Sequence, residues 1–289
     1  MKWLVLVLLA ACGGSDDAPA ADASACPRPS GDKSTVGDIT GADSTELSGL
    51  AASHTIENLL WTLGDAGNPA TLWGIGSTTG ASHGALKIKG ADNVDWEDLS
   101  VAPCPAGSAS CIYISDLGDN ALARTDYALY IIPEPSSLVG DKDSDAATKH
   151  TIAYPDGSHD VEAIFVDSRD HAVYAIEKVM ANQARVYHLV LDGTAEQIGQ
   201  LTLSDSDPRV TAADIFVDAC NARLAIRTHS ALHELRSTAD ASIASLLTSP
   251  LASLPVADED QGESVAYAAD GASYFTTSEG KNPPLHAVK

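Results

Sequence analysis

A unit of about 50 residues recurs five times along this chain, and this repetition constrains the fold more than any other feature. Each unit carries three short segments in the same order, rich in aliphatic and aromatic residues and separated by turn residues, as expected of β-strands. The first segments usually open on an acidic residue and span residues 46–53, 97–101, 162–167, 213–218 and 263–268. The five units are therefore expected to pack against one another as copies of one structural element.

A fourth, weaker segment closes the first four units, at residues 85–89, 149–154, 196–203 and 243–247. The fifth unit ends with the chain, but residues 33–40 precede the first unit and can supply its missing strand. Closure of the last unit by an N-terminal strand removes the open sheet edge, as in β-propellers. We therefore expect an all-β propeller of five four-stranded blades over residues 33–289. A sixth blade within residues 97–160 and an irregular pair of β-sandwiches are the alternatives.

Strand direction places acidic residues at one end of the predicted channel. First strands line the channel of a propeller and run from one face to the other, and second strands run back. First-strand starts and second-strand ends therefore meet at one mouth. The starts contribute Glu46, Glu97, Asp98, Glu162, Asp214 and Glu263. The second-strand ends contribute Asp65, Asp116, Asp119, Glu177, Lys178, Arg227, Glu279 and Lys281.

Carboxylates gathered at one mouth repel one another unless a cation or backbone N–H groups compensate them. A hard cation such as Ca²⁺ takes roughly six to eight oxygen ligands. The predicted ligands of such an ion are Glu97, Glu162, Glu263, Asp65, Asp119 and Asp214. The rest of the predicted binding face consists of Glu46, Asp98, Asp116, Asn120, Arg124, His159, Glu177, Arg227 and Glu279. The other interpretation is that these residues cap turns and are solvated.

The five acidic openings are not equivalent. Aligned on the aliphatic run, Glu97, Glu162 and Glu263 share one position, where the fourth unit has Ala213 and places Asp214 one residue later. Because side chains alternate along a strand, Asp214 should face differently unless a bulge corrects it.

The N-terminus is typical of a targeting segment. Lys2 and an apolar run over residues 3–9 precede Leu9-Ala10-Ala11-Cys12, which resembles a bacterial lipobox. We expect residues 1–12 to be a lipoprotein signal with a lipid on Cys12, and residues 13–32 to be a flexible tether. The lipid would be the only membrane contact, at the outer membrane or surface of a bacterial envelope. An ordinary secretory signal cut further along is the alternative.

The remaining cysteines fit two disulfides in an oxidising compartment. Cys104 and Cys111 flank a Pro-, Gly- and Ser-rich turn, which favours a local bridge, and Cys26 with Cys220 follows by elimination. Zinc is the rival, but the chain has no CxxC spacing.

The net charge and the absence of two catalytic motifs argue against several classes of function. The net charge of -23, from 17 Lys and Arg against 40 Asp and Glu, argues against nucleic acid as a partner. The chain contains no GxSxG or HExxH motif. His159 and His229 fall near the acidic mouth and are candidate acid/base groups, although lone loop histidines are more often solvated.

Several motifs carry a family resemblance. Residues 95–98 (DWED), 116–120 (DLGDN), Arg124 and Glu134-Pro135 resemble a pattern of a poorly characterised family of secreted bacterial β-propellers in the TolB-like group. Residues 61–67 and 278–280 are similar too, and the resemblance covers most of residues 46–289. The family is often described as six-bladed and brings no established reaction. It implies that DWED and DLGDN are site-like elements.

Three functions remain open. The first is a monomeric, lipid-anchored binding module whose acidic mouth, with Ca²⁺, holds a small molecule, a glycan or an envelope protein. The second is a metal-dependent hydrolase of lactones, esters or phosphoesters, with His159 or a carboxylate as base. The third is a structural envelope protein.

Overall fold

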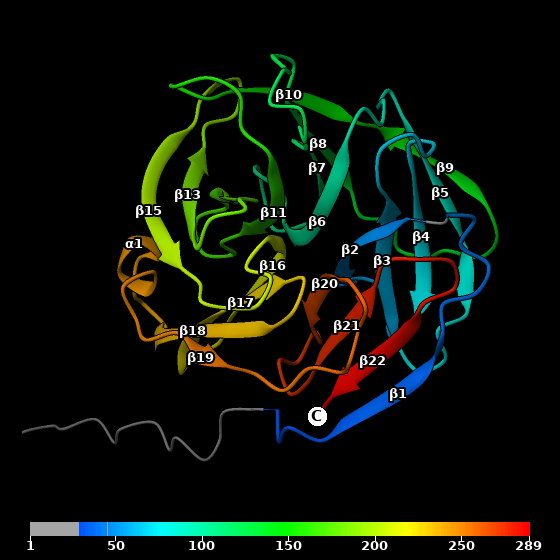
Figure 1. The fold of residues 1–289 in the computed structure, drawn as a ribbon. Coiled ribbons are helices and arrows are strands. Elements are labelled where there is room, and N and C mark those ends of the chain that lie inside the picture. The colour runs from blue at the N-terminus through cyan, green and yellow to red at the C-terminus, as the bar shows by residue number, and fades with distance from the viewer. Residues whose placement is uncertain (1–28, 45) are drawn as a thin grey trace, which may run out of the picture.

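The computed structural model describes residues 29–44 and 46–289, and five β-sheets arranged as blades around one axis make up this part of the chain (Figure 1). Blade 1 contains β2 (Leu47–Ala52), β3 (Leu59–Gly64), β4 (Thr71–Gly76) and β5 (Ser82–Lys89). Blade 2 contains β6 (Trp96–Pro103), β7 (Ser110–Asp116), β8 (Ala128–Pro133) and β10 (Thr148–Ala153). Blade 3 contains β11 (Val161–Val166), β12 (Val173–Glu177), β13 (Gln183–Leu189) and β15 (Glu196–Thr202).

The last two blades complete the ring. Blade 4 contains β16 (Val210–Val217), β17 (Asn221–Thr228), β18 (Leu232–Thr238) and the two-residue β19 (Ala252–Ser253). Blade 5 contains β20 (Gly262–Tyr267), β21 (Tyr274–Ser278), β22 (Pro284–Val288) and β1 (Lys33–Asp38). The inner strands β2, β6, β11, β16 and β20 contact one another in this order, and β20 returns to β2. The predicted five-bladed propeller is confirmed, and the described residues form no sixth blade.

The ring closes as the sequence predicted. The N-terminal strand β1 pairs antiparallel with the C-terminal strand β22, from Lys33 opposite Val288 to Asp38 opposite Pro284. Figure 1 shows the two strands, blue and red, side by side at the edge of blade 5. This pairing gives β22 a neighbour on its outer side and joins the two ends of the chain within blade 5.

Two segments outside the repeat cover outer blade edges. The long connection after β8 contains β9 (Lys142–Ala146), which pairs parallel with β5 of blade 1. The connection after β13 contains β14 (Gly193–Thr194), which pairs parallel with β10 of blade 2. The extra residues between 97 and 160 therefore form a long connection in blade 2, and part of this connection adds a strand to blade 1.

The prediction of a fourth strand at residues 243–247 was wrong. This segment is the helix α1 (Ile243–Leu246), whose N-cap Ser242 accepts a hydrogen bond from the Ser245 N–H at 3.2 Å. Ile243 and Leu246 are buried against the core between blades 3 and 4. Spacing of three residues puts both side chains on one helix face, so a helix buries them where an edge strand would expose one.

The hydrophobic core is divided among the blade interfaces. Five clusters of buried residues each lie between two neighbouring blades, so every sheet contributes to two of them. Trp61 of blade 1 is fully buried, and its Nε1 donates to Glu134 Oε1 of blade 2 at 2.9 Å. Glu134 of the Glu-Pro motif thus fastens two blades together.

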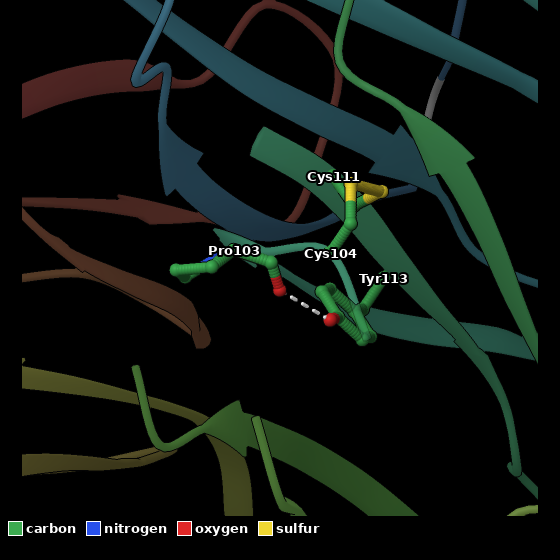
Figure 2. Close-up of a disulfide and its surroundings, with 4 residues drawn as sticks. All are labelled: Pro103, Cys104, Cys111 and Tyr113. Atoms are coloured by element: carbon green, nitrogen blue, oxygen red, sulfur yellow. Dashed lines mark hydrogen bonds between the residues drawn. A yellow bond between two sulfur atoms is a disulfide. The ribbon is translucent and has the colours of Figure 1, made fainter. Parts of the chain in front are cut away.

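The disulfide between Cys104 and Cys111 is confirmed and closes the turn between β6 and β7 (Figure 2). Beside it, the Tyr113 hydroxyl donates to the Pro103 carbonyl at 2.6 Å. The predicted bridge from Cys26 to Cys220, the lipidation of Cys12 and most of the predicted tether involve positions outside the described residues. No helix in the described part of the chain is long and apolar enough to cross a membrane.

Candidate functional site

All five inner strands are irregular near their first residues. The pairing of each inner strand with its neighbour skips at Gly49, Glu97-Asp98, Glu162, Thr211 and Glu263. A bulge re-aims the side chain at the skipped position. Register therefore makes Thr211, not Ala213, the counterpart of Glu162 and Glu263 in blade 4.

Three carboxylates meet at one mouth of the channel. One oxygen each from Asp65, Asp95 and Glu97 lies within 4.8 Å of the other two. Asp65 follows β3, and Asp95 and Glu97 stand at the start of β6, so second-strand end and first-strand start converge as strand direction predicts. We call these residues the carboxylate triad.

Glu97 is the member of the triad whose charge is least compensated. Its side chain is 2% exposed, and its Oε1 has no hydrogen-bond partner among the described residues. Gly118, in the DLGDN segment, lies against this oxygen, and a Cβ there would clash with it and come within 2.8 Å of Asp95 Oδ2. Glycine at position 118 thus lets the carboxylates of Glu97 and Asp95 lie directly against the backbone.

Burial and mutual repulsion disfavour three negative charges here. Burial raises the pKa of Asp65, and it raises the pKa of Asp95 to about 6, with Asp65 adding to the rise. The pKa of Glu97 lies well above its usual value because of burial first, and then of the charges on Glu162, Asp65 and Asp95. A cation bound between these oxygens would offset both the cost of burying their charges and the repulsion among them.

A small cavity of about 40 Å³ continues the mouth across the channel. Its lining comes from blades 1, 3 and 5: Glu46, Asp65, Glu162, Lys178, Gln261, Glu263 and Glu279. Lys178 donates to Glu162, and the Gln261 amide donates to both Glu263, at 2.7 Å, and Glu279. We call this cavity together with the triad the acidic mouth.

Asp98 is next to Glu97 but has a different environment. It is fully buried, and its Oδ1 accepts the Leu99 N–H at 2.8 Å. Its Oδ2 accepts the N–H groups of Ile164 on β11, at 3.0 Å, and Ala213 on β16, at 3.3 Å. Burial raises the pKa of Asp98 and these donors oppose the rise. The residue joins three inner strands, and its oxygens are occupied.

The DLGDN segment also serves the loop that follows it. Asp119, predicted as a ligand, accepts the backbone N–H groups of Ala123 and Arg124 and the Tyr127 hydroxyl at 2.9, 2.8 and 2.7 Å. These bonds outweigh burial and lower the pKa of its carboxyl. Asp116 pairs with Arg124 at 3.0 Å. The structure therefore gives Asp119, Asp116 and Arg124 the role of shaping this loop, while Asn120 is exposed on it.

His159 does not have the free ring nitrogen that a general base requires. Its Nδ1 lies 2.9 Å from Glu177 Oε1 and its Nε2 lies 2.7 Å from Asp156 Oδ1. Glu177 is itself paired with Arg185 at 2.8 Å, which helps to hold its pKa below the usual value although burial opposes this.

His229 has a ring nitrogen without a hydrogen-bond partner among the described residues, which His159 lacks. Its Nδ1 lies 3.7 Å from Glu263 Oε1, and its buried Nε2 has no partner among the residues that the structure describes. Burial lowers the pKa of His229 to about 4, so its ring is neutral at pH 7.

Two predicted members of the face are not presented on it: Asp214 lies at the opposite mouth and Arg227 is buried below the surface. Asp214 stands three positions after Thr211 on β16 and lines a pocket of about 170 Å³ with the ends of the inner strands, at the opposite mouth. There its carboxylate accepts the Tyr267 N–H at 2.7 Å. Arg227 is buried beneath Gly262 and pairs with the buried side chain of Glu259 at 2.7 Å. The structure does not bring Asp214 to the mouth where it was predicted as a ligand, because the register matches Thr211, two residues before Ala213, to Glu162.

Four important residues were not among the predicted ligands or the predicted binding face: Asp95, Gly118, Lys178 and Gln261. Asp95 and Gly118 lie inside the DWED and DLGDN segments, so the motifs were a usable signal for them. Lys178 directly follows Glu177, at a second-strand end. Gln261 precedes β20 in a loop, and no pattern in the chain distinguishes it.

Comparison with known proteins supports the fold. A gluconolactonase from Xanthomonas campestris has 13% sequence identity and a TM-score of 0.50, over 89% of this chain and 89% of its own. A glucose dehydrogenase has 9% identity and a TM-score of 0.52, over 89% of this chain and 99% of its own. No protein-family model and no curated protein matches the sequence. The solved structures share the β-propeller, and they bring no sequence evidence for the TolB-like group.

Proposed function

We propose that this protein is an extracytoplasmic binding module in which the carboxylate triad holds a divalent cation such as Ca²⁺. The observation that carries the proposal is Glu97 Oε1, a buried carboxylate oxygen without a hydrogen-bond partner among the described residues, within the same cluster as Asp65 and Asp95. Buried carboxylates without donors are costly, and a cation is the partner that a set of oxygen ligands fits best.

The donor set also indicates the kind of ion. The triad offers only carboxylate oxygens, which suit hard cations such as Ca²⁺ or Mg²⁺ and not the softer metals that prefer thiolate or imidazole. Asp65, Asp95 and Glu97 would hold the ion, with Glu162 close enough to raise the pKa of Glu97 by its charge. When bound, the ion would offer its open positions to an oxygen of a ligand. Three carboxylates supply fewer ligands than such an ion takes, so positions remain for that purpose.

A metal-dependent hydrolase is the second candidate, and one observation favours it. The ring of His229 lies near Glu263, with 3.7 Å between its Nδ1 and Glu263 Oε1, and its Nε2 has no hydrogen-bond partner among the described residues, so this ring is the candidate general base beside the mouth carboxylates. This proposal moves the base role from His159 to His229. It requires turnover of a lactone, ester or phosphoester that chelation abolishes and that His229→Gln reduces at least about tenfold.

The cellular setting is part of the proposal. The lipobox-like segment supports a lipid on Cys12 that tethers a monomeric propeller to the outer membrane or cell surface. Cys12→Ser should then move the protein from the detergent phase to the aqueous phase in Triton X-114 partitioning. Equal partitioning of the variant and the wild type would contradict a lipid anchor.

Isothermal titration calorimetry with CaCl₂ tests the cation site. After treatment with a chelator and desalting, the wild-type protein should bind the ion, whereas Glu97→Gln and Asp95→Asn should bind it at least about tenfold more weakly. Glu46→Gln is the matched control, because Glu46 is exposed on the same mouth outside the triad. Binding of equal strength in all four proteins would refute the site, and absence of any cation or ligand would favour the structural alternative.

A further inference from the structure

A groove of about 480 Å³ lies beside the acidic mouth, and neither the cation nor the fold accounts for it. Loops from three blades line it, with Leu122 from blade 2, Val179 and Met180 from blade 3, and Arg209 ahead of blade 4. Lys178 lines both this groove and the small cavity of the mouth. A molecule in the groove would therefore reach the mouth past Lys178. We call this feature the rim groove.

The loop that presents Leu122 is held firmly. Leu122 has a φ of 51°, a left-handed conformation that is unfavourable for a bulky residue. Asp119 enforces it, because its carbonyl accepts the Leu122 N–H at 2.8 Å and its carboxylate accepts the next two backbone N–H groups. Strain that is over-determined by its surroundings is typical of functional sites. Here it displays an apolar side chain that is 59% exposed.

Exposed apolar side chains gather on the same face of the molecule. Among the described residues, the large hydrophobic side chains that are exposed are Val94, Leu122, Val139 and Met180. Val94 precedes β6, Leu122 follows β7 and Met180 follows β12, which are all connections at the mouth, whereas Val139 follows β8 on the opposite face. Clustered exposed apolar groups beside a cavity indicate a binding surface.

The charges around the rim groove are paired within the protein. Lys178 pairs with Glu162, Arg209 with Asp207, and Glu177 with Arg185. Asp160, which also lines the groove, accepts the Asp119 N–H at 2.7 Å. Beyond Lys178, the mouth holds Asp65, Asp95, Glu97, Glu263 and Glu279, more carboxylates than one divalent ion neutralises. A carboxylate or phosphate would be repelled there, and an ammonium group would compete with the bound ion and with Lys178. An uncharged head bearing hydroxyl or carbonyl oxygens avoids both penalties.

We propose that the rim groove binds an uncharged amphipathic small molecule, with its apolar part between Leu122 and Met180 and a hydroxyl or carbonyl oxygen directed past Lys178 to the cation. The inference rests on the proposed cation site for the oxygen contact only. The apolar contacts are made by the groove itself, so the two parts can be tested separately.

The test uses three probes with the same six-carbon tail: hexyl β-D-glucoside, heptanoate and hexyltrimethylammonium. Each is titrated calorimetrically into wild-type protein, first with saturating CaCl₂ and then with a chelator. The glucoside should bind at least about tenfold more tightly than either charged probe, and chelation should weaken it. The Leu122→Ser/Met180→Ser double variant should lose glucoside binding at least about tenfold and keep its Ca²⁺ affinity, and Val139→Ser on the opposite face should change neither.

The outcomes separate the two proposals. Glucoside binding that the double variant retains, stronger binding of heptanoate or of the ammonium probe, or no binding of any probe would overturn the groove proposal. Glucoside binding that depends on Leu122 and Met180 in a protein that binds no Ca²⁺ would leave the groove standing and refute the cation site.

Discussion

Glu97 and Asp98 are adjacent carboxylates with opposite environments: Asp98 accepts three backbone N–H groups, and Glu97 Oε1 accepts none from the described residues. Both side chains are buried at the start of β6. The protein satisfies one charge with its own backbone and leaves the other for a partner. This contrast distinguishes a structural carboxylate from a candidate ligand.

Replacing Asp98 should destabilise the fold. Asp98→Ala leaves the N–H groups of Ile164 and Ala213 without their acceptor in the channel, and each buried unpaired group costs about 1–3 kcal/mol. We expect urea unfolding to show a loss of about 3 kcal/mol, with Asp98→Asn losing less because it keeps one acceptor oxygen. Glu46→Ala, at an exposed position, should change the free energy of unfolding by less than about 0.5 kcal/mol. A loss below about 1 kcal/mol for Asp98→Ala would contradict the bridging role.

Replacing Glu97 should not destabilise the fold, but it should remove the stabilisation that Ca²⁺ provides. With a chelator present, Glu97→Gln removes a buried, poorly compensated carboxyl, so the free energy of unfolding should stay equal or rise. With Ca²⁺ at about 100 times its dissociation constant, the wild type should gain about 2.7 kcal/mol and the variant should gain much less. Urea melts in the two buffers measure both effects. Destabilisation of the variant under chelation would indicate a structural role for Glu97.

Gly118→Ala should block the cation site without removing a ligand. A Cβ at this position would clash with Glu97 Oε1 and crowd Asp95 Oδ2, so both carboxylates would have to move out of the triad geometry. Calcium affinity should fall at least about tenfold, as in a ligand variant. Thermal denaturation under chelation reports whether the fold is kept, and unchanged affinity in a folded variant would show that the ion does not depend on the present positions of the Glu97 and Asp95 carboxylates.

Stability should fall as pH rises through the acidic mouth's titration range. Burial raises the pKa of Glu263 from 4.5 to about 7. The native state therefore holds this proton more tightly than the unfolded chain does, so its contribution is full below about pH 4.5 and is lost as pH rises to about 7. Urea unfolding under chelation, compared between about pH 5 and about pH 8, should show a smaller fall for Glu263→Gln than for wild type. A larger fall in the variant would reverse the sign and refute the assignment.

The blade architecture could be predicted because it depends on a repeated pattern. Segments of alternating or continuous apolar residues recur in a fixed order, and residues 33–40 could be matched to the missing strand without any contact information. The helix at Ile243–Leu246 was missed because four residues carry too little periodicity to separate a helix from a strand. The pairing of β9 with β5 joins different repeats, and no local pattern specifies it.

The candidate site was predicted as a location more accurately than as a set of residues. Strand direction correctly brings Asp65 to the start of β6, since this follows from topology alone. In the fourth unit, alignment on the aliphatic run is two residues out of register, because Thr211 and not Ala213 matches Glu162; Asp214 therefore lies at the other mouth, and a strand's own sequence does not show this register. Backbone N–H groups occupy the carboxylates of Asp98 and Asp119, and carboxylates occupy the ring nitrogens of His159. These partners come from other positions in the chain, so residue type alone could not distinguish the three residues from ligands.

The position of a bound ion tests the central claim most directly. Crystals grown with MnCl₂ in place of CaCl₂ give an anomalous signal at any bound manganese. We expect a peak at the start of β6 with oxygens of Asp65, Asp95 and Glu97 about 2.1–2.6 Å away, and no such peak in Glu97→Gln crystals. Manganese found only at other places, with Glu97 Oε1 hydrogen-bonded to a protein group, would contradict the account.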